Sequence, residues 1–86
     1  MSADAAAGTG VRAVVEVLAK ALADDEVRVT ETQQSKGTLI ELFVSQRDMA
    51  KVLGRSGRTA AALRTLAATA GERDGKQVTL EIRESR

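Results

Sequence analysis

The residues best suited to chemistry form the short run Gly54-Arg55-Ser56-Gly57, with Arg58 directly after it. Glycine adopts backbone conformations with positive φ and allows another molecule to come close, and the two arginines add guanidinium donors. If a helix begins after Gly57, its unpaired N–H groups and the positive end of its dipole point to the same place. This combination predicts a binding site for phosphate groups.

A G-x-x-G run is common, and a plain corner between two helices is its alternative explanation. Predicted helix boundaries at both glycines and the basic residues at the tip favour the phosphate site. The run is not a Walker A loop, because the spacing and the Gly-Lys-Ser/Thr ending are absent. Gly8-Thr9-Gly10 is not a dinucleotide fingerprint either, because no predicted strand precedes it.

The chain of 86 residues contains no His, Cys, Pro, Trp or Tyr, and Phe43 is its only aromatic residue. It therefore has no thiol nucleophile, imidazole base, Cys/His zinc site or disulfide. The carboxylates of Asp24, Asp25 and Glu26 are interpreted as a solvated turn. We therefore expect a protein that is not an enzyme and needs no cofactor. The lack of aromatics also excludes the base-stacking surfaces used by many single-strand binders.

The net charge of +1 is divided unevenly along the chain. Residues 1–46 have a net charge of −3, and residues 47–86 have a net charge of +4. Between Arg47 and Arg64, five basic residues are accompanied by only one acidic residue, Asp48. A local basic stretch on a nearly neutral chain predicts an anionic partner, with a solvated helix face as the alternative.

The length is that of one small domain, which we place at residues 11–84. No segment has the roughly 18 consecutive apolar residues of a membrane span, so no membrane contact is expected. Residues 1–10 are rich in Ala and Gly and lack the features of a signal peptide, which predicts a flexible N-terminal tail. We expect a soluble protein of the cytoplasm.

Apolar spacing predicts six elements in the order α-β-β-α-α-β. The second helix has Ser45 as its N-cap, with Asp48 placed as in a capping box. The first two strands are expected to form a hairpin with a loop of several residues over 33–37. In chain order, we predict a helix over 11–22, strands over 27–30 and 38–44, a helix from Ser45 to Gly54, a helix from Gly57 to Gly71, and a strand over 78–83.

The fold class that follows is α+β. The third strand returns after a helical crossover and should lie parallel to the second, giving a three-stranded mixed sheet with three helices on one face. Leu53 and Leu66 are among the helix residues expected in the core. Leu39 and Phe43 would face the open side of the sheet, as an apolar patch suited to a partner or a second copy. The alternative is that the tail or the first helix covers this patch.

The run Asp48-Met-Ala-Lys-Val-Leu-Gly-Arg-Ser-Gly-Arg-Thr-Ala-Ala-Ala-Leu-Arg-Thr-Leu resembles the signature of bacterial KH domains of type II. The resemblance extends from Val11 to Arg83 and is strongest to the KhpA family of small bacterial proteins with a single KH domain. Two residues depart from that pattern. Leu53 stands where Ile is common, and Phe43 stands where a polar side chain is frequent.

The resemblance implies that the protein clamps about four nucleotides of single-stranded RNA over the loop, as KH domains do. Bases would meet an apolar floor of Ala50, Leu53 and Ala61. It further implies a homodimer or a heterodimer with a KhpB/Jag-type KH protein, and a role as post-transcriptional regulator or RNA chaperone in cell elongation and division. The alternative is a dimerisation module with little RNA binding of its own. The residues assigned to RNA are Gly54, Arg55, Ser56, Gly57, Arg58 and Lys51, with Arg64, Arg73 and Lys76 as weaker candidates.

Overall fold

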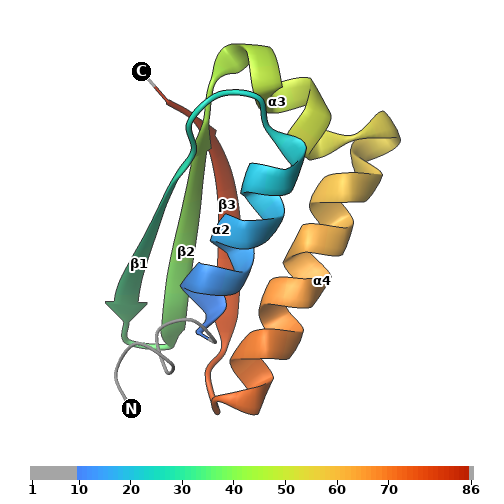
Figure 1. The fold of residues 1–86 in the computed structure, drawn as a ribbon. Coiled ribbons are helices and arrows are strands. Elements are labelled where there is room, and N and C mark those ends of the chain that lie inside the picture. Colours follow the sequence, from blue (N-terminus) through green and yellow to red (C-terminus); the bar gives the residue numbers. More distant parts are fainter. Residues whose placement is uncertain (1–9, 86) are drawn as a thin grey trace.

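The computed structural model describes residues 10–85 and has the predicted order of elements (Figure 1). The predicted tail, 1–10, lies outside the described residues apart from Gly10. None of the described helices has both the length and the apolar character needed to cross a membrane. The elements are α2 (Val11–Leu22), β1 (Arg28–Gln34), β2 (Gly37–Val44), α3 (Gln46–Leu53), the 3-10 turn η1 (Arg55–Gly57), α4 (Arg58–Arg73) and β3 (Val78–Glu84).

The sheet has the strand order β1-β2-β3, with β1 antiparallel and β3 parallel to the central strand β2. Ile40 of β2 lies opposite Glu31 of β1 and Leu80 of β3. The three α-helices of the described residues all lie on one side of the sheet (Figure 1). The predicted mixed sheet with helices on one face is confirmed.

The core forms where the helices meet the inner face of β2. Ile40, Leu42 and Val44 are all fully buried, as their alternation with half-buried residues predicts. The helices cover them with small and branched side chains, which include Val15, Ala19, Val52, Leu63 and Ala67.

The hairpin is tighter than predicted. Strand β1 continues to Gln34, which pairs with Gly37, so the turn consists of Ser35 and Lys36 and the expected loop over 33–37 is wrong. The polar residues at the end of β1 lack an alternating pattern, and their pairing with β2 decides their conformation. Gly37 has a φ of +152°, and a Cβ there would lie 2.3 Å from the carbonyl oxygen of Gln77. Glycine therefore allows the hairpin to touch the α4–β3 connection.

Two leucines expected in the core are exposed instead. Leu53 is 37% exposed and Leu66 is 47% exposed. On α3 the inward positions are taken by Asp48 and Val52, which turns Leu53 outward. Helix α4 also continues past Gly71, its predicted end, to Arg73. Gly71 is buried against Val78, and a Cβ at Gly71 would lie only 2.4 Å from Cγ2 of Val78.

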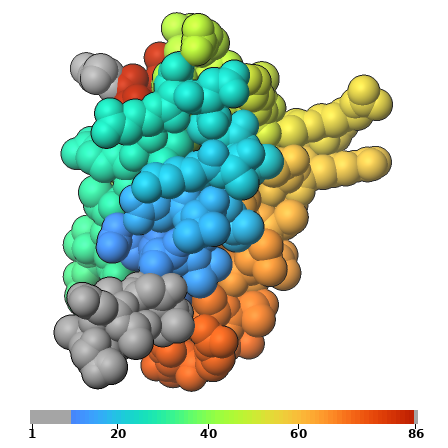
Figure 2. Space-filling model, in the orientation of Figure 1, coloured from blue at the N-terminus to red at the C-terminus, as the bar shows by residue number. Residues whose placement is uncertain are grey.

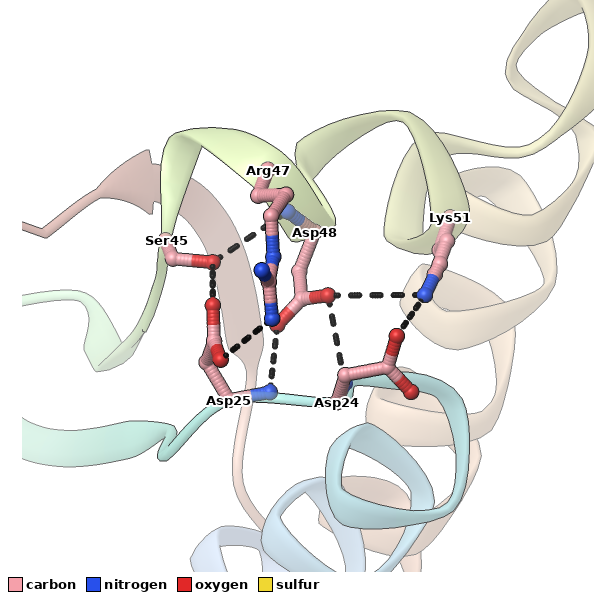
Figure 3. Close-up of polar contacts among 6 residues, drawn as sticks. All are labelled: Asp24, Asp25, Ser45, Arg47, Asp48 and Lys51. Carbon is pink, nitrogen blue, oxygen red and sulfur yellow. Dashed lines mark hydrogen bonds and ion pairs between the residues drawn. The ribbon is translucent and has the colours of Figure 1, made fainter.

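The start of α3 is bound to the turn that follows α2. Ser45 Oγ accepts a hydrogen bond from the Asp48 N–H at 3.2 Å, as an N-cap should. The Asp48 carboxylate, however, accepts hydrogen bonds from the backbone N–H groups of Asp24, at 3.1 Å, and Asp25, at 2.8 Å (Figure 3). The predicted capping box is therefore only half formed. Asp24, Asp25 and Glu26 are exposed, as a solvated turn requires, and two of their backbone N–H groups are bound by Asp48 as well.

Charged side chains surround this junction (Figure 3). Asp25 accepts hydrogen bonds from Ser45 Oγ at 2.8 Å and from Arg47 at 2.9 Å. Lys51 pairs with Asp24, and its Nζ lies 3.8 Å from Oδ1 of the fully buried Asp48. The hydrogen bond with Asp24 raises the pKa of Lys51 above its usual value.

We expect the Asp48 carboxylate to stabilise the fold in a pH-dependent way. The backbone hydrogen bond from Asp25, the strongest influence, holds the pKa of Asp48 below its usual 3.8, although burial acts in the opposite direction. The stabilisation is therefore complete well above pH 3.8 and is lost as the pH falls through the lower pKa of the folded state. Asp48→Asn should lower the thermal midpoint by several degrees at neutral pH, with a smaller difference in acid.

Thermal unfolding of both proteins at several pH values between about pH 7 and about pH 3 measures this difference. Asp74→Asn, which alters an exposed carboxyl group at the end of α4, is the matched control. Parallel pH profiles for the wild type and Asp48→Asn would contradict the assigned role of the carboxylate.

Candidate nucleic-acid interface

The loop between α3 and α4 depends on backbone conformations that favour glycine. Gly54 has φ 76° and ψ 171°, a region that is essentially restricted to glycine. A Cβ at Gly54 would also lie 2.2 Å from Oγ1 and 2.9 Å from the backbone nitrogen of Thr59. Gly57 has a φ of +73° with no atom within 4 Å of its Cβ position. Gly54 is therefore required by both conformation and packing, and Gly57 by conformation alone.

The turn leaves the beginning of α4 open to a ligand. Gly57 N–H donates to Gly54 O at 3.1 Å, and Arg58 N–H donates to Arg55 O. Gly57 is the N-cap of α4, and no side chain caps this helix end. The Arg58 N–H is used in this turn, and the N–H groups that follow it add donors and a positive dipole end to the loop. Figure 2 shows the yellow segment around the loop projecting from the body of the protein.

The arginines beside the loop have no carboxylate partner in the part of the chain that the structure describes. Arg55 and Arg58 are both exposed, and neither forms an ion pair within residues 10–85. Arg64, two turns along α4, donates from Nε to the Leu80 carbonyl at 3.4 Å. The side chains of the loop and of the first half of α4 thus present positive charge that no described carboxylate neutralises.

The other predicted RNA-binding cations either pair with carboxylates or lie far from the loop. Lys51 is held by the carboxylates of the acidic turn. Arg73 is in the last turn of α4, at the end opposite the loop. Lys76 follows in the α4–β3 connection and pairs with Glu31 at 3.3 Å. The structure therefore gathers the predicted residues from Gly54 to Arg58 at one end and leaves Arg73 and Lys76 at the other.

A groove runs between α4 and β3. One hollow of about 470 Å³ is lined by Arg64, Thr65, Ala68 and the strand residues 78–81. A second, of about 370 Å³, continues toward Lys76. Ala68 and Val78 line both hollows, so the two lie next to each other. Sequence reasoning missed Thr65 and Ala68, because nothing in the pattern separates a groove wall from an ordinary exposed helix face.

Small apolar residues are exposed near the loop. Ala50 and Ala61 are exposed, and Leu53 is 37% exposed. Leu53 is therefore not in the core, as one expectation had it. Its side chain is instead accessible to a ligand at the surface where the apolar floor was predicted.

The open face of the sheet is more polar than predicted. Leu39 and Phe43 are only half-buried there. The Arg28 guanidinium lies 4.4 Å from the centre of the Phe43 ring, as in a cation–π contact. Arg83 pairs with Glu41 at 2.8 Å on the same face. Charged groups thus interrupt the apolar patch, and its role as an interface stays a prediction.

Known proteins with similar sequences are small RNA-binding proteins. The RNA-binding protein KhpA of Aquifex aeolicus is 45% identical over 78 residues, which cover 88% of this chain and 99% of that protein. The RNA-binding protein KhpA of Caldanaerobacter subterraneus is 44% identical over 71 residues, covering 80% of this chain and 95% of that protein.

A solved structure supports the fold. The crystal structure of an Aquifex aeolicus Era variant, bound to GDP and tetrafluoroaluminate, matches 87% of this chain with a TM-score of 0.57 and 16% identity. This chain covers 30% of that structure. The family described as "KhpA/KhpB, KH domain" matches residues 12–82. The chain therefore belongs to the KhpA/KhpB family, and its α-β-β-α-α-β order is that of a type II KH domain.

Proposed function

We propose that this protein binds single-stranded RNA through the loop from Gly54 to Gly57 and the groove between α4 and β3. The observation that carries the proposal is the pair of guanidiniums, Arg55 and Arg58, that have no ion pair within residues 10–85 and lie at an uncapped helix N-terminus, with a groove that begins at Arg64 of the same helix. The names of the KhpA relatives, which are RNA-binding proteins, support it.

In this proposal the loop binds the phosphate backbone. Gly54 and Gly57 have no side chains to obstruct its approach, and Arg55, Ser56 and the first N–H groups of α4 donate hydrogen bonds to phosphate oxygens. Contacts of this kind do not depend on base identity. The loop therefore holds the strand in place without reading its sequence.

The bases would lie in the groove. Glu72 and Glu81 are among the residues that line it, and their negative charge disfavours phosphate groups there, which favours the strand orientation with bases inward. Strand β3 is an edge strand, so its outer backbone groups can hydrogen-bond to base edges. Without aromatic stacking, we expect modest affinity and a loose sequence preference.

The family resemblance extends the proposal to the cell. We infer a cytoplasmic post-transcriptional regulator or RNA chaperone, linked to cell elongation and division through a KhpB/Jag-type partner. Its function would be binding, without catalysis. Lys51, Arg73 and Lys76 are proposed as auxiliary RNA contacts, which would require Lys51 and Lys76 to exchange a carboxylate for a phosphate.

A second proposed function is protein association through the open face of the sheet. It is favoured by Phe43, which the helices leave uncovered beside a hollow of about 280 Å³ lined by Val27, Arg28 and Ser85. A second copy or a KhpB/Jag-type protein could cover Phe43 and Leu39 there, and the protein would act as a dimerisation module.

The double variant Arg55→Asp/Ser56→Asp should weaken RNA binding by more than about tenfold, because it places negative charge where phosphates bind. Both residues are exposed, so the thermal midpoint should hardly change. Fluorescence anisotropy with a short RNA measures the affinity. Lys20→Glu/Ala21→Glu makes the same change of net charge on the exposed side of α2 and should bind as the wild type does. Equal affinity of the two double variants would refute the loop site.

Phe43→Arg should abolish self-association if the sheet face is an interface, because the new charge would lie beside Arg28 and Arg83. Light scattering of the wild type, this variant and Thr69→Arg, an exposed α4 position, measures the molecular mass. We expect a dimer for the wild type and Thr69→Arg and a monomer for Phe43→Arg. The same mass for all three proteins would remove Phe43 from any self-association surface.

A further inference from the structure

We propose that the RNA-binding surface continues beyond the groove to the β1–β2 hairpin, where Lys36 binds an additional phosphate. The ligand would then be a single strand longer than the four or so nucleotides that a KH domain clamps. This inference rests on the proposed function and assigns to the hairpin a contact that the loop and groove do not supply.

The β1–β2 hairpin and the α4–β3 connection contact each other at the lower end of the molecule in Figure 1. Thr38 N–H donates to the Gln77 carbonyl at 2.8 Å. Gly37 lies so close to that carbonyl that no Cβ could be accommodated. Lys36 is the residue just before this contact, so its position relative to the end of the groove is set by the backbone.

A third hollow continues the groove to the hairpin. It has a volume of about 190 Å³ and is lined by Lys36 and Gln34 of the hairpin and by Gln77 and Thr79 of the neighbouring chain segment. Gln77 also lines the hollow of about 370 Å³, and Thr79 also lines that of about 470 Å³. The three hollows therefore adjoin one another in a row from Arg64 to Lys36, which we call the trough.

The unpaired positive charge of the described chain follows this trough. Six of the twelve cations of residues 10–85 form an ion pair of known partner, as Lys20 does with Glu16 at 3.3 Å and Lys76 with Glu31. Lys36 is exposed and has none within those residues. The cations without an ion pair there are Arg28, Lys36, Arg55, Arg58 and Arg64, and all but Arg28 border the loop or the trough.

The chemistry of the far end suits a strand that leaves the groove. The ammonium of Lys36 is a compact charge on a flexible stem, which binds phosphate without requiring one geometry. The side-chain amides of Gln34 and Gln77 can donate to or accept from a base or a ribose hydroxyl. An additional phosphate at Lys36 would add to affinity and to salt dependence, with little effect on sequence preference.

The test compares oligouridine strands of about four and about eight nucleotides. Binding to the wild type, Lys36→Gln and the control Lys20→Gln is measured by fluorescence anisotropy over a range of salt concentrations. We expect the longer strand to bind the wild type more tightly and with a steeper salt dependence. Lys36→Gln should weaken only the longer strand and make its slope of log K against log salt shallower by about 0.7, the value for one phosphate of a single strand.

Identical binding of the longer strand by Lys36→Gln and Lys20→Gln would overturn this inference and leave the loop site intact. An equal loss for both lengths in Lys36→Gln would also overturn it, because Lys36 would then act on the short clamp itself. Failure of the wild type to bind either strand would refute the proposed function and this inference together.

Discussion

The buried carboxylate of Asp48 is the interaction on which the geometry of the candidate interface depends. It accepts hydrogen bonds from the backbone N–H groups of Asp24 and Asp25 in the α2–β1 connection, 24 and 23 positions away in the sequence. Helix α3 has only eight residues, and Val52 is its fully buried apolar side chain. Without Asp48, two donors would lose their acceptor at a partly buried junction, which is costly. The orientation of α3, and with it the position of Gly54 at its end, therefore depends on this carboxylate.

The same junction also determines which cations of the basic stretch are available to an anionic ligand. The basic stretch from Arg47 to Arg64 looks uniform in the sequence, but the acidic turn pairs with Arg47 and Lys51. The cations of that stretch that have no ion pair within residues 10–85 are on η1 and α4, beside the loop and the groove. Pairing thus concentrates the field of a nearly neutral chain on one side, where it can attract a polyanion.

Much of the fold was predictable, because the pattern of β2 and the glycines at 54 and 57 are local signals. The order of elements, the strand directions and the helix-covered face are confirmed. The errors concern contacts between distant segments. The length of β1 is determined by its pairing with β2, and the exposure of Leu53 follows from the inward position of Asp48. The hydrogen-bond partners of the Asp48 carboxylate are 24 and 23 positions away in the sequence. The loop site was predicted from its residues, whereas the identity of the residues that line the groove depends on the packing of α4 on β3.

The salt dependence of RNA affinity is the most direct test of an electrostatic clamp. If about four phosphates are neutralised, log K against log salt should have a slope near −3, from about −0.7 per phosphate of a single strand. The measurement uses the full chain and a short oligouridine at several salt concentrations. A slope near −3 supports a backbone clamp at the Gly54–Gly57 loop. A slope near zero would show that affinity does not come from phosphate contacts and would contradict the account.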